Sequence, residues 1–572
     1  MSAISTAATI FTSSTSSRRT TQTTPTDLAM ASPSPPSSKE ADLYYWGLPS
    51  RPKLVARSST HVWEDPFWSP SPSMMHKSLR PADGNPLLHR LWNDATSSLR
   101  IQIVEAVDAA DWTAVDILRL GCAGEFHTTL LVSVKPASLS WSQAHPITLR
   151  CKAILEGHGI DNVHCEIRES IVTPCGNVLS RSKSAAVADT TSGLQLSSAS
   201  RTRLRADRVD MSDCLGTRIS MKDDDTRFGT KGIYLSVKPS DRQKGEQQPK
   251  IVALACGHVV APQKSRSLTT RLQGSQTPRE AIQIDQPEYD SRLARLESSA
   301  RQDRNHATES RNCGDTESAV AYDQIADDEE DLVRKMKPYV ASSSRVFGTL
   351  LSAPKLVYSR ALRDTPGYDP WLRDWALIEL LPRRHQISLN TLRNKVFVGP
   401  PNHLRSIVHD NSAGWRGLER INVPAALNGT LALAKTAVPM SELYQPAPDA
   451  SDDEPTMLVA QYGAGGKLTV GLGNSLKSLV RRNEALDGGV ENYGEEWAVT
   501  SFAGTDHLQA AFSLKGDSGS CVWDIHTRRP AAIIMAGVHS PAQNGGNDVT
   551  YAQPLERLLG DIGQYGFDVS LV

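Results

Sequence analysis

The sequence predicts a mainly β protein, preceded by a small α/β domain and a disordered N-terminal tail. Three observations predict this organisation. Short apolar runs separated by turn residues follow one another from Cys214 to the end of the chain, as in all-β folds. A helix-spaced pattern between strand-like runs occupies residues 86–172. Residues 1–85 are rich in Ser, Thr and Pro, a composition typical of disordered chain.

The bulk composition restricts the classes of function. The 572 residues carry a net charge of −1, which gives no bulk attraction for nucleic acid or an acidic membrane surface. No run approaches the ~20 apolar residues that a membrane-spanning helix needs. The eight cysteines lack CxxC spacing, so we expect reduced thiols rather than disulfides or a zinc site. We expect no cofactor, no nucleic-acid partner and no membrane partner. The oligomeric state stays open.

The first residues bear on location. They contain no uninterrupted apolar core of the signal-peptide type, and Arg18 and Arg19 precede the first acidic residue, Asp27. Mitochondrial transit peptides share this composition with Ser/Thr-rich disordered tails. We therefore expect an intracellular protein, cytoplasmic or nuclear, with a mitochondrial location as the alternative. The aromatic cluster Tyr44 to Trp46 either docks on a folded surface or stays exposed.

Residues 86–172 are predicted to form a β-α-β-like unit. A helical pattern begins at Leu99, and the run TLLVSVKP from Thr129 predicts a buried strand. A second helical pattern ends near Gly157, and another strand begins at Val163. The segment has no Gly-rich phosphate loop and no paired carboxylates on one face. Its composition therefore favours a packing or docking domain.

The rest of the chain is divided by its composition. Residues 173–212 are rich in Ser, Thr and Arg and are predicted to be a linker. Residues 213–425 and 426–572 each carry a series of short strand-like runs and are predicted to be two β domains. Residues 264–344 interrupt the first of these domains. They are crowded with Arg, Asp, Glu and Gln, which predicts a partly helical or disordered insert.

The run KGDSGSCVWD places Ser518 in a glycine-flanked turn that enters an apolar strand. A serine nucleophile needs an exposed hydroxyl on a tight turn, with backbone N–H groups that converge on the developing oxyanion. Gly516 allows the backbone to point its N–H toward that position, and Gly519 leaves the far side of Ser518 uncrowded. A structural turn is the alternative, but GDSGS before an apolar strand is more restrictive than any GxSxG.

Two further runs supply the groups that would activate this hydroxyl. In ALACGHVV, His258 ends an apolar strand, which presents an imidazole from a rigid edge as a general base requires. In RDWALIEL, Asp374 directly precedes an apolar run, where a carboxylate can fix the tautomer of a histidine ring. Each residue taken alone is more typical of a structural or surface position.

Together, in the chain order His258, Asp374, Ser518, these segments resemble the trypsin/chymotrypsin superfamily of serine peptidases over about residues 213–572. The resemblance implies two chymotrypsin-like six-stranded β-barrels. It also implies a serine endopeptidase that cleaves a protein or peptide substrate through an acyl-enzyme intermediate. His258 would take the proton of Ser518, and Asp374 would orient His258. The N–H groups of Gly516 and Ser518 would form the oxyanion hole.

The sequence departs from the secreted members of that superfamily. Val259 follows His258 where secreted animal enzymes have Cys, and their disulfide pattern is missing. No segment resembles their activation-cleavage N-terminus, so Asp517 lacks its usual partner. The spacing from His258 to Asp374 is long, which we attribute to the charged insert looping out from the barrel surface.

Three residues are expected to bind the substrate. Phe512 falls at the position that the resemblance assigns to the base of the primary specificity pocket, which disfavours a preference for Arg or Lys. The Gly-x-His segment at His539 resembles glutamate-specific endopeptidases and picornaviral main proteases, which implies a hydrogen bond to a Glu or Gln side chain. The alternative is a histidine that lines an apolar pocket. By the same resemblance, Ser540 is expected to hydrogen-bond Asp374.

A catalytically silent scaffold or interaction protein is the alternative to an active peptidase, because a fold alone does not establish activity. An intact set of three side chains together with Gly516 favours the enzyme. A nucleic-acid-binding function has in its favour only local basic runs such as SRTRLRADR, from Ser200 to Arg208.

Overall fold

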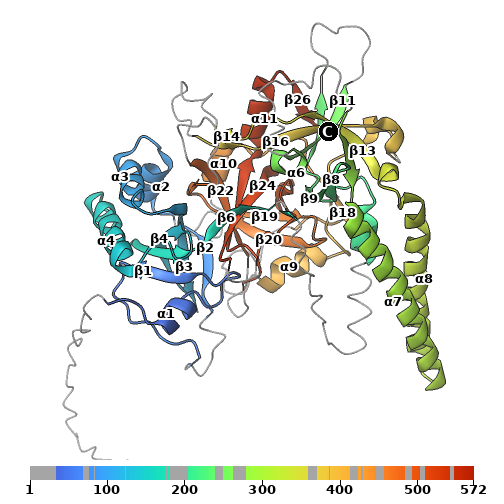
Figure 1. Ribbon diagram of the computed structural model, residues 1–572, viewed down its shortest axis with the longest axis horizontal. Helices are drawn as coiled ribbons and strands as arrows, with labels where there is room; N and C mark the ends of the chain where they lie inside the picture. Colours follow the sequence, from blue (N-terminus) through green and yellow to red (C-terminus); the bar gives the residue numbers. More distant parts are fainter. Residues whose placement is uncertain are drawn as a thin grey trace, which may run out of the picture. The chain divides into compact units, whose positions relative to one another are not determined.

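The computed structural model describes residues 34–67, 76–82, 84–122, 124–175, 177–178, 204–238, 249–261, 278–358, 370–385, 387–411, 423–426, 429–445, 456–482, 493–502, 509–541 and 546–572 (Figure 1). Two large sheets organise this part of the chain. One sheet contains a closed barrel and runs into an N-terminal α/β domain. The other is an open sheet that carries a long helical hairpin.

Six strands from the C-terminal part close into an antiparallel barrel. Around the barrel they are β19 (Met457–Tyr462), β20 (Leu468–Gly473), β22 (Gly494–Ser501), β25 (Val549–Pro554), β24 (Pro530–His539) and β23 (Cys521–Asp524), which pairs again with β19. Buried apolar side chains fill the barrel because both faces of most of these strands are covered. Helix α11 (Leu555–Gln564) follows directly after Pro554. The prediction of a closed six-stranded barrel is confirmed.

The second closed barrel that the resemblance implied is not seen in the described residues. Nine strands form an open sheet in the order β26 (Val569–Leu571), β10 (Tyr234–Val237), β11 (Lys250–Cys256), β16 (Trp375–Leu380), β13 (Val346–Ser352), β12 (Glu280–Gln283), β8 (Arg218–Met221), β9 (Asp224–Thr230) and β7 (Asn177–Val178). The sheet stays open because β10 and β9 each pair outward, with β26 and β7, rather than with each other.

The N-terminal domain is built on the barrel sheet rather than beside it. Strands β3 (Trp112–Cys122), β4 (Glu125–Val134) and β5 (His164–Glu169) form its centre, and α4 (Trp141–Gly157) crosses between the parallel pair β4 and β5. Helices α2 (Pro86–Asn93) and α3 (Ser98–Val107) complete its core. Strand β21 (Ser478–Val480) pairs with β3 on one side and with β22 on the other, so the two sheets are continuous.

The predicted disordered tail, residues 1–85, requires correction. From Ser34 onward its described residues fold, with α1 (Ser38–Leu43), β1 (Lys53–Arg57) on β5 and β2 (Ser78–Pro81) on β3. The phenolic groups of Tyr44 and Tyr45 both donate to Glu166, at 2.7 and 2.8 Å. These buried hydrogen bonds help to offset the conformational entropy that the tail loses when it folds. The composition of the tail does not reveal them. Residues 1–33 lie outside the described residues.

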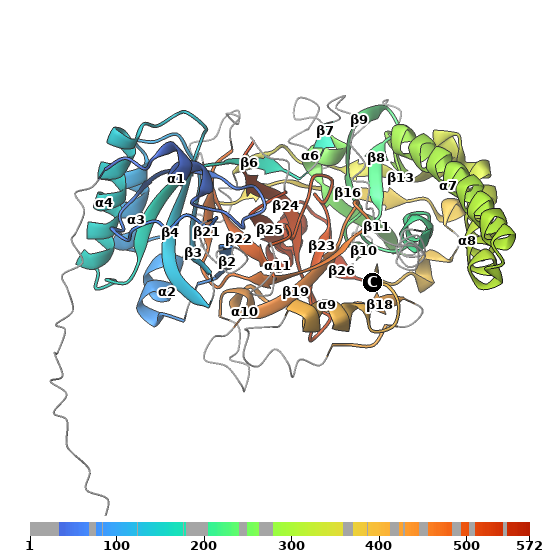
Figure 2. The same ribbon diagram turned by 90° about the horizontal axis from the view of Figure 1, so that it is seen from below.

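The charged insert forms two helices and one strand. Strand β12 belongs to the open sheet, and helices α7 (Gln286–Asn312) and α8 (Thr316–Met336) lie side by side in both views (Figures 1 and 2). Arg304 of α7 pairs with three acidic side chains of α8, among them Asp323 at 3.1 Å and Glu330 at 3.0 Å. These exposed ion pairs add to a buried apolar cluster that includes Leu296, Leu332 and Met336, and together they hold this highly charged segment as a helical hairpin.

Short elements complete the described chain. They are β6 (Ile171–Pro174), α6 (Gly257–Val260), β14 (Val357–Tyr358), β15 (Leu372–Arg373), β17 (Lys395–Phe397), β18 (Thr430–Ala432), α9 (His403–Asn411), α10 (Met440–Tyr444) and four 3-10 turns, Lys337–Tyr339, Ser342–Arg345, Pro382–Arg384 and Leu389–Thr391. Both ends of the predicted linker 173–212 are structured, because residues 173–175 lie along the barrel and residues 204–210 are helical. Within the described chain, no helix has the length and apolar character needed to cross a bilayer.

One buried carboxylate joins the N-terminal domain to the barrel. Glu495 of β22 is fully buried and pairs with Arg100 of α3, with Lys477 at 2.8 Å and with Arg557 of α11 at 4.0 Å. Removing the carboxylate that these buried cations share would leave part of their charge without compensation. We expect Glu495→Ala to lower the free energy of unfolding by about 3–5 kcal/mol.

Urea denaturation followed by tryptophan fluorescence would measure this loss. Asp108→Ala is the matched control, because Asp108 pairs with Arg481 at the surface and its side chain is 62% exposed. That change should cost less than about 1 kcal/mol. Equal midpoints for Glu495→Ala and the wild type would contradict a stabilising role for the cluster.

Candidate active site

His258 and Asp374 lie together because their strands are neighbours. β11 pairs with β16 so that Cys256 is opposite Trp375, and each strand end carries one of the two residues. The N–H of Gly257 donates to the main-chain oxygen of Asp374 at 3.0 Å, and the N–H of His258 donates to Asp374 Oδ1 at 2.9 Å. The other carboxylate oxygen, Oδ2, hydrogen-bonds His258 Nδ1. This arrangement fixes the orientation of the imidazole ring.

The residues on either side of Asp374 are tied to α11. Asp561 accepts from the guanidinium of Arg373 at 2.8 and 2.7 Å and from the indole N–H of Trp375 at 2.7 Å. Because both neighbours are held, the main chain at Asp374 has little freedom to move. Asp374 itself is only 2% exposed, so its carboxylate acts in a site that largely excludes water.

Ser518 meets the other end of the same imidazole. Its Oγ lies 2.9 Å from His258 Nε2 and also 2.9 Å from the carbonyl oxygen of Met535. A hydroxyl has one proton, so it donates to one of these acceptors at a time. Donation to Nε2 is the arrangement from which a base can remove the proton. The structure thus brings His258, Asp374 and Ser518 from distant parts of the chain into one hydrogen-bonded line.

Thr230 of the open sheet fixes the loop that carries Ser518. Its N–H donates to the Ser518 carbonyl at 2.8 Å, and its hydroxyl donates to the Gly516 carbonyl at 2.8 Å. Gly516 and Gly519 have φ values of +103° and +97°, in the region that favours glycine. A Cβ at Gly516 would lie 2.7 Å from the Phe228 ring, and one at Gly519 would clash with the Thr230 carbonyl. The sequence pattern around Ser518 therefore follows from a closely packed turn.

Two N–H groups of this loop converge on one carbonyl oxygen. The N–H of Gly516 donates to the carbonyl of Cys175, and the N–H of Ser518 approaches the same oxygen at 3.5 Å. An oxyanion hole needs backbone donors that point together at the oxygen of the reacting carbonyl. Gly516 and Ser518, the residues expected to form such a hole, have this arrangement.

The carbonyl in this position belongs to the protein itself. Strand β6 lies antiparallel to β24, with Thr173 opposite Gly537 and Pro174 opposite Ala536 (Figure 2). The N–H of Cys175 then donates to the carbonyl of Met535 at 3.1 Å. The main chain up to Cys175 therefore runs along the barrel strand that passes next to Ser518.

The side chain of Cys175 is buried and contacts polar side chains. Its sulfur accepts from Asn547 Nδ2 at 3.3 Å and lies 3.8 Å from Ser513 Oγ, which contacts Thr550 Oγ1 at 2.6 Å. Burial, and then the charge of Asp517, raise the pKa of the Cys175 thiol to about 12. Cys175 is only 2% exposed, so its neutral side chain is enclosed by protein.

The three residues expected to bind substrate occupy different places. Phe512 is 1% exposed and belongs to the same buried apolar cluster as Cys175. His539 Nδ1 lies 3.4 Å from the hydroxyl of Thr173, two residues before Cys175. Burial, and then Lys515, lower the pKa of His539. The N–H of Ser540 donates to Ser50 Oγ at 2.8 Å.

Asp517 has partners of its own within the barrel. Its Oδ2 accepts from the N–H of Leu514 at 2.8 Å and from Gln461 Nε2 at 3.4 Å, and Gly463 leaves room for its carboxyl group. Gln461 is itself held, because its side chain also contacts Thr469 and Ser520. The nucleophile loop is thus supported without a newly formed chain terminus.

One group of potential metal ligands overlaps the same site. Cys256, His258 and Asp374 each have a ligand atom within 4.8 Å of those of the others. A cation held there would have to replace the hydrogen bond between His258 Nδ1 and Asp374, and the thiol of Cys256 already donates to the Ile534 carbonyl at 3.3 Å. The observed contacts therefore favour the hydrogen-bonded arrangement.

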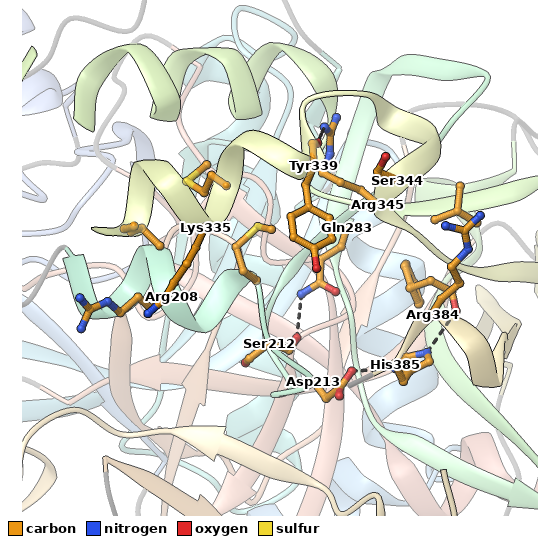
Figure 3. A pocket seen from close by; sticks show the side chains of 15 residues that line it. Arg208, Ser212, Asp213, Gln283, Lys335, Tyr339, Ser344, Arg345, Arg384 and His385 are labelled. Atoms are coloured by element: carbon orange, nitrogen blue, oxygen red, sulfur yellow. Dashed lines mark hydrogen bonds and ion pairs between the residues drawn. The ribbon is translucent and has the colours of Figure 1, made fainter. Parts of the chain in front are cut away.

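A separate pocket of about 540 Å³ lies where the helical hairpin meets the open sheet (Figure 3). Several of its labelled side chains are hydrogen-bonded to one another or to the main chain. His385 Nδ1 lies 2.7 Å from Asp213 Oδ1, and Gln283 Nε2 donates to the Ser212 carbonyl at 2.8 Å. None of the residues predicted from the sequence to form the site lines this pocket.

Sequence reasoning missed several residues that shape the site: Cys175, Thr230, Gln461, Met535, Asn547 and Asp561. Most of them act through main-chain atoms or hold other residues, which leaves no side-chain motif to find. Asp561 is an acidic residue in a C-terminal helix, where no local pattern connects it with Asp374. The pairing of β6 with β24 was hidden in a segment whose composition predicts a linker.

Asp517 predicts a pH dependence of stability. Burial raises the pKa of its carboxyl to about 7. The folded state therefore binds this proton more tightly than the unfolded state, whose pKa is close to 3.8. The stabilisation is complete below about pH 4 and is lost as the pH rises to about 7, at up to about 1.4 kcal/mol per pH unit.

Asp517→Asn should flatten this part of the curve of unfolding free energy against pH. Urea titrations at a series of pH values would measure it. Asp161→Asn, at an exposed turn, is the matched control and should leave the slope as in the wild type. A steep slope that survives in Asp517→Asn would assign the titration to another buried acid, such as Glu496, whose pKa burial raises to about 8.

No protein-family model matches this chain, and no curated protein matches its sequence significantly. A function for the chain therefore has to be inferred from the geometry of its own residues.

Proposed function

We propose that this protein is a serine endopeptidase that cleaves peptide bonds through Ser518, His258 and Asp374. The observation that carries the proposal is the continuous hydrogen-bonded line from Asp374 through both nitrogens of His258 to Ser518 Oγ at 2.9 Å. The N–H groups of Gly516 and Ser518 point at one carbonyl oxygen beside it. These are the parts that acyl transfer to a serine requires.

In the proposed reaction, Ser518 Oγ attacks the carbonyl carbon of the substrate while His258 Nε2 takes the hydroxyl proton. Asp374 stabilises the imidazolium that forms and holds the tautomer with its proton on Nδ1. The carbonyl oxygen becomes an oxyanion, which the two N–H donors stabilise in a largely buried site. His258 then protonates the leaving amine, and an ester of Ser518 remains.

Water completes the cycle. His258 removes a proton from a water molecule that attacks the ester, and the same two N–H groups stabilise the second oxyanion. The acid product leaves, and Ser518 regains its proton from His258. No metal or organic cofactor takes part in this sequence.

The proposal extends to the architecture and location of the protein. The closed barrel would be the second barrel of a chymotrypsin-like pair, and the open sheet would correspond to the first. His258 and Asp374 come from the open sheet, and Ser518 comes from the barrel, as that family requires. All eight cysteines are free, which supports a reducing, intracellular compartment.

One observation favours the alternative, a catalytically silent scaffold. Strand β6 and Cys175 occupy the groove beside Ser518 and its N–H donors, where a substrate would have to bind. A protein that never releases this segment would show no turnover on added peptides. The two functions differ in whether Ser518 is chemically reactive once the segment is displaced.

Opening the groove provides the test. Opposite residues of two antiparallel strands alternate between hydrogen-bonded and non-hydrogen-bonded pairs. The hydrogen bond from the N–H of Cys175 to the Met535 carbonyl identifies Pro174 and Ala536 as a non-hydrogen-bonded pair. The next pair, Thr173 with Gly537, is therefore hydrogen-bonded. Thr173→Pro removes an N–H from that pair and should loosen β6. We expect a fluorophosphonate probe to label Ser518 in Thr173→Pro faster than in the wild type, as measured by mass spectrometry of the labelled peptide.

Two controls accompany this measurement. Thr173→Val keeps the N–H and should be labelled at the wild-type rate. Ser518→Ala in the Thr173→Pro background should abolish labelling. If Thr173→Pro and the double variant are equally unlabelled while both are folded, Ser518 is not an activated nucleophile and the scaffold function replaces the proposal.

The carboxylate of Asp374 should raise kcat for peptide hydrolysis by several orders of magnitude. Asp374→Asn keeps an oxygen that can accept from the N–H of His258 but presents an amide to Nδ1, which favours the wrong tautomer. In the Thr173→Pro background we expect kcat on a fluorogenic peptide to fall by about 10⁴-fold, with KM little changed.

Asp524→Asn is the matched control for this substitution, since Asp524 bonds the turn after β23 and not the site. It should leave kcat within a few-fold of the parent. A drop of less than about tenfold in Asp374→Asn would mean that the carboxylate does not orient the base.

A further inference from the structure

Strand β6 reaches the candidate active site in the orientation of a substrate. Its residues pair with β24 in antiparallel register, from Ile171 opposite His539 to Pro174 opposite Ala536. Pro174 lies at the position whose nitrogen faces away from β24, so the missing N–H costs the pairing nothing. This arrangement delivers one particular carbonyl, that of Cys175, to the reactive residues.

The contacts of Cys175 are those that a residue under attack would make. Its N–H donates to Met535, its carbonyl oxygen accepts from Gly516 and is 3.5 Å from the N–H of Ser518, and its side chain is enclosed by Asn547 and Ser513. The carbonyl oxygen is therefore where an oxyanion would be stabilised, and the side chain is where specificity would be exerted.

The described chain resumes two residues after Cys175, in the other sheet. Strand β7, Asn177–Val178, pairs with β9 of the open sheet, with Asn177 opposite Phe228. Gly176 lies outside the described residues. The main chain thus pairs with the closed barrel before the Cys175 carbonyl and with the other sheet after it. The described chain is therefore held by main-chain pairing both before and after Gly176.

The N-terminal domain holds this segment in place. Only Ser170 separates β6 from β5, a strand in the centre of that domain. The N–H of Ser170 donates to the Val134 carbonyl at 2.9 Å, and its carbonyl accepts from the Thr113 hydroxyl at 2.9 Å. β6 is therefore an extension of a folded sheet. This tether gives β6 a high effective concentration at the candidate active site.

We propose that the protein cleaves itself once, within its own chain, at the peptide bond between Cys175 and Gly176. The inference rests on the proposed function, and it assigns to the N-terminal domain the role of presenting this bond.

Water is the only co-reactant that this cleavage needs. Ser518 Oγ bonds to the Cys175 carbonyl carbon, and its proton passes to His258 Nε2. The bond from that carbon to the Gly176 nitrogen breaks, and His258 gives its proton to the new amine. Water then hydrolyses the ester, which leaves a carboxyl group on Cys175 and restores Ser518. The products are residues 1–175 and residues 176–572.

The two products should remain together after cleavage. β3 stays paired with β21, and Glu495 keeps its ion pairs with Arg100 of the N-terminal domain and with Lys477. A native size measurement would therefore show one species, while denaturing electrophoresis would show two chains. The enclosure of the Cys175 side chain also indicates that peptides with a small uncharged side chain before the scissile bond are the preferred substrates.

The experiment uses the full-length chain made by cell-free translation, sampled over time. We expect the intact chain to disappear with first-order kinetics that do not depend on protein concentration. N-terminal sequencing of the larger product should begin at Gly176, and intact mass should place the other break after Cys175. Ser518→Ala should stay as one chain, also when it is mixed with processed wild-type protein.

A pair of variants tests the register. Cys175→Ser preserves a small side chain and should be cleaved within about tenfold of the wild-type rate, because the thiol only fills the enclosed space. Cys175→Arg places a side chain far larger than the thiol in the buried space beside Asn547 and Ser513, so cleavage should be lost. Fluorophosphonate labelling of Ser518 in Cys175→Arg should persist or increase, which separates a misplaced segment from a misfolded enzyme.

The outcomes separate the two proposals. An intact wild-type chain, together with Ser518 labelling in Cys175→Arg or Thr173→Pro, would overturn self-cleavage and leave the peptidase standing. An intact chain with no labelling in any variant would overturn both. Cleavage that persists in Ser518→Ala, or that begins at another residue, would show that a different agent or a different register is responsible.

Discussion

Thr230 is the residue on which the candidate site depends most. It belongs to the open sheet, yet its N–H and hydroxyl hold the carbonyls of Ser518 and Gly516, which belong to the loop of the closed barrel. The same hydroxyl accepts from the N–H of Ala464 at 3.0 Å. Ser518, on the closed barrel, and His258, on the open sheet, can stay within hydrogen-bonding distance only if the two sheets are held together at that point. The fully buried Thr230 connects the two sheets through these hydrogen bonds.

The base side of the site is held in a different way. Asp374 is fixed by its neighbours, since Arg373 and Trp375 share the carboxylate of Asp561 on α11. Helix α11 follows barrel strand β25, so the closed barrel also supports the carboxylate from behind. The two halves thus restrain each other at two places, one in front of the nucleophile and one behind the base. A preorganised site needs this support, because small errors in position lower catalytic rates steeply.

The sequence allowed the three central side chains to be chosen because each stands beside a strongly patterned strand. His258 follows an apolar run, Asp374 precedes one, and Ser518 lies between two glycines that need positive φ values. The closed barrel could be predicted for the same reason. The second closed barrel is not seen in the described residues, where the ends of the open sheet recruit β26 and β7, and no local pattern encodes which distant strand an edge will choose.

Other features depend on long-range contacts that composition cannot reveal. Residues 34–82 look disordered in the sequence, but Tyr44 and Tyr45 find Glu166 on another strand. The place of Cys175 depends on main-chain pairing, to which almost any residue could contribute. His539 was assigned to the primary pocket from a short motif, whereas register puts it beside Thr173. In each case the missing information was a pairing partner.

The continuity of the sheet through β21 has a consequence for how this protein can be divided. Strand β3 covers one edge of β21, so a fragment that begins after the N-terminal domain would uncover a row of unpaired N–H and C=O groups. It would also expose Leu476 and Leu479, which are buried in the core of that domain. Such an edge recruits strands from other molecules, so the isolated C-terminal part should be prone to aggregation. The N-terminal domain thus protects the edge of β21. The two parts should therefore be expressed together and fold as one unit.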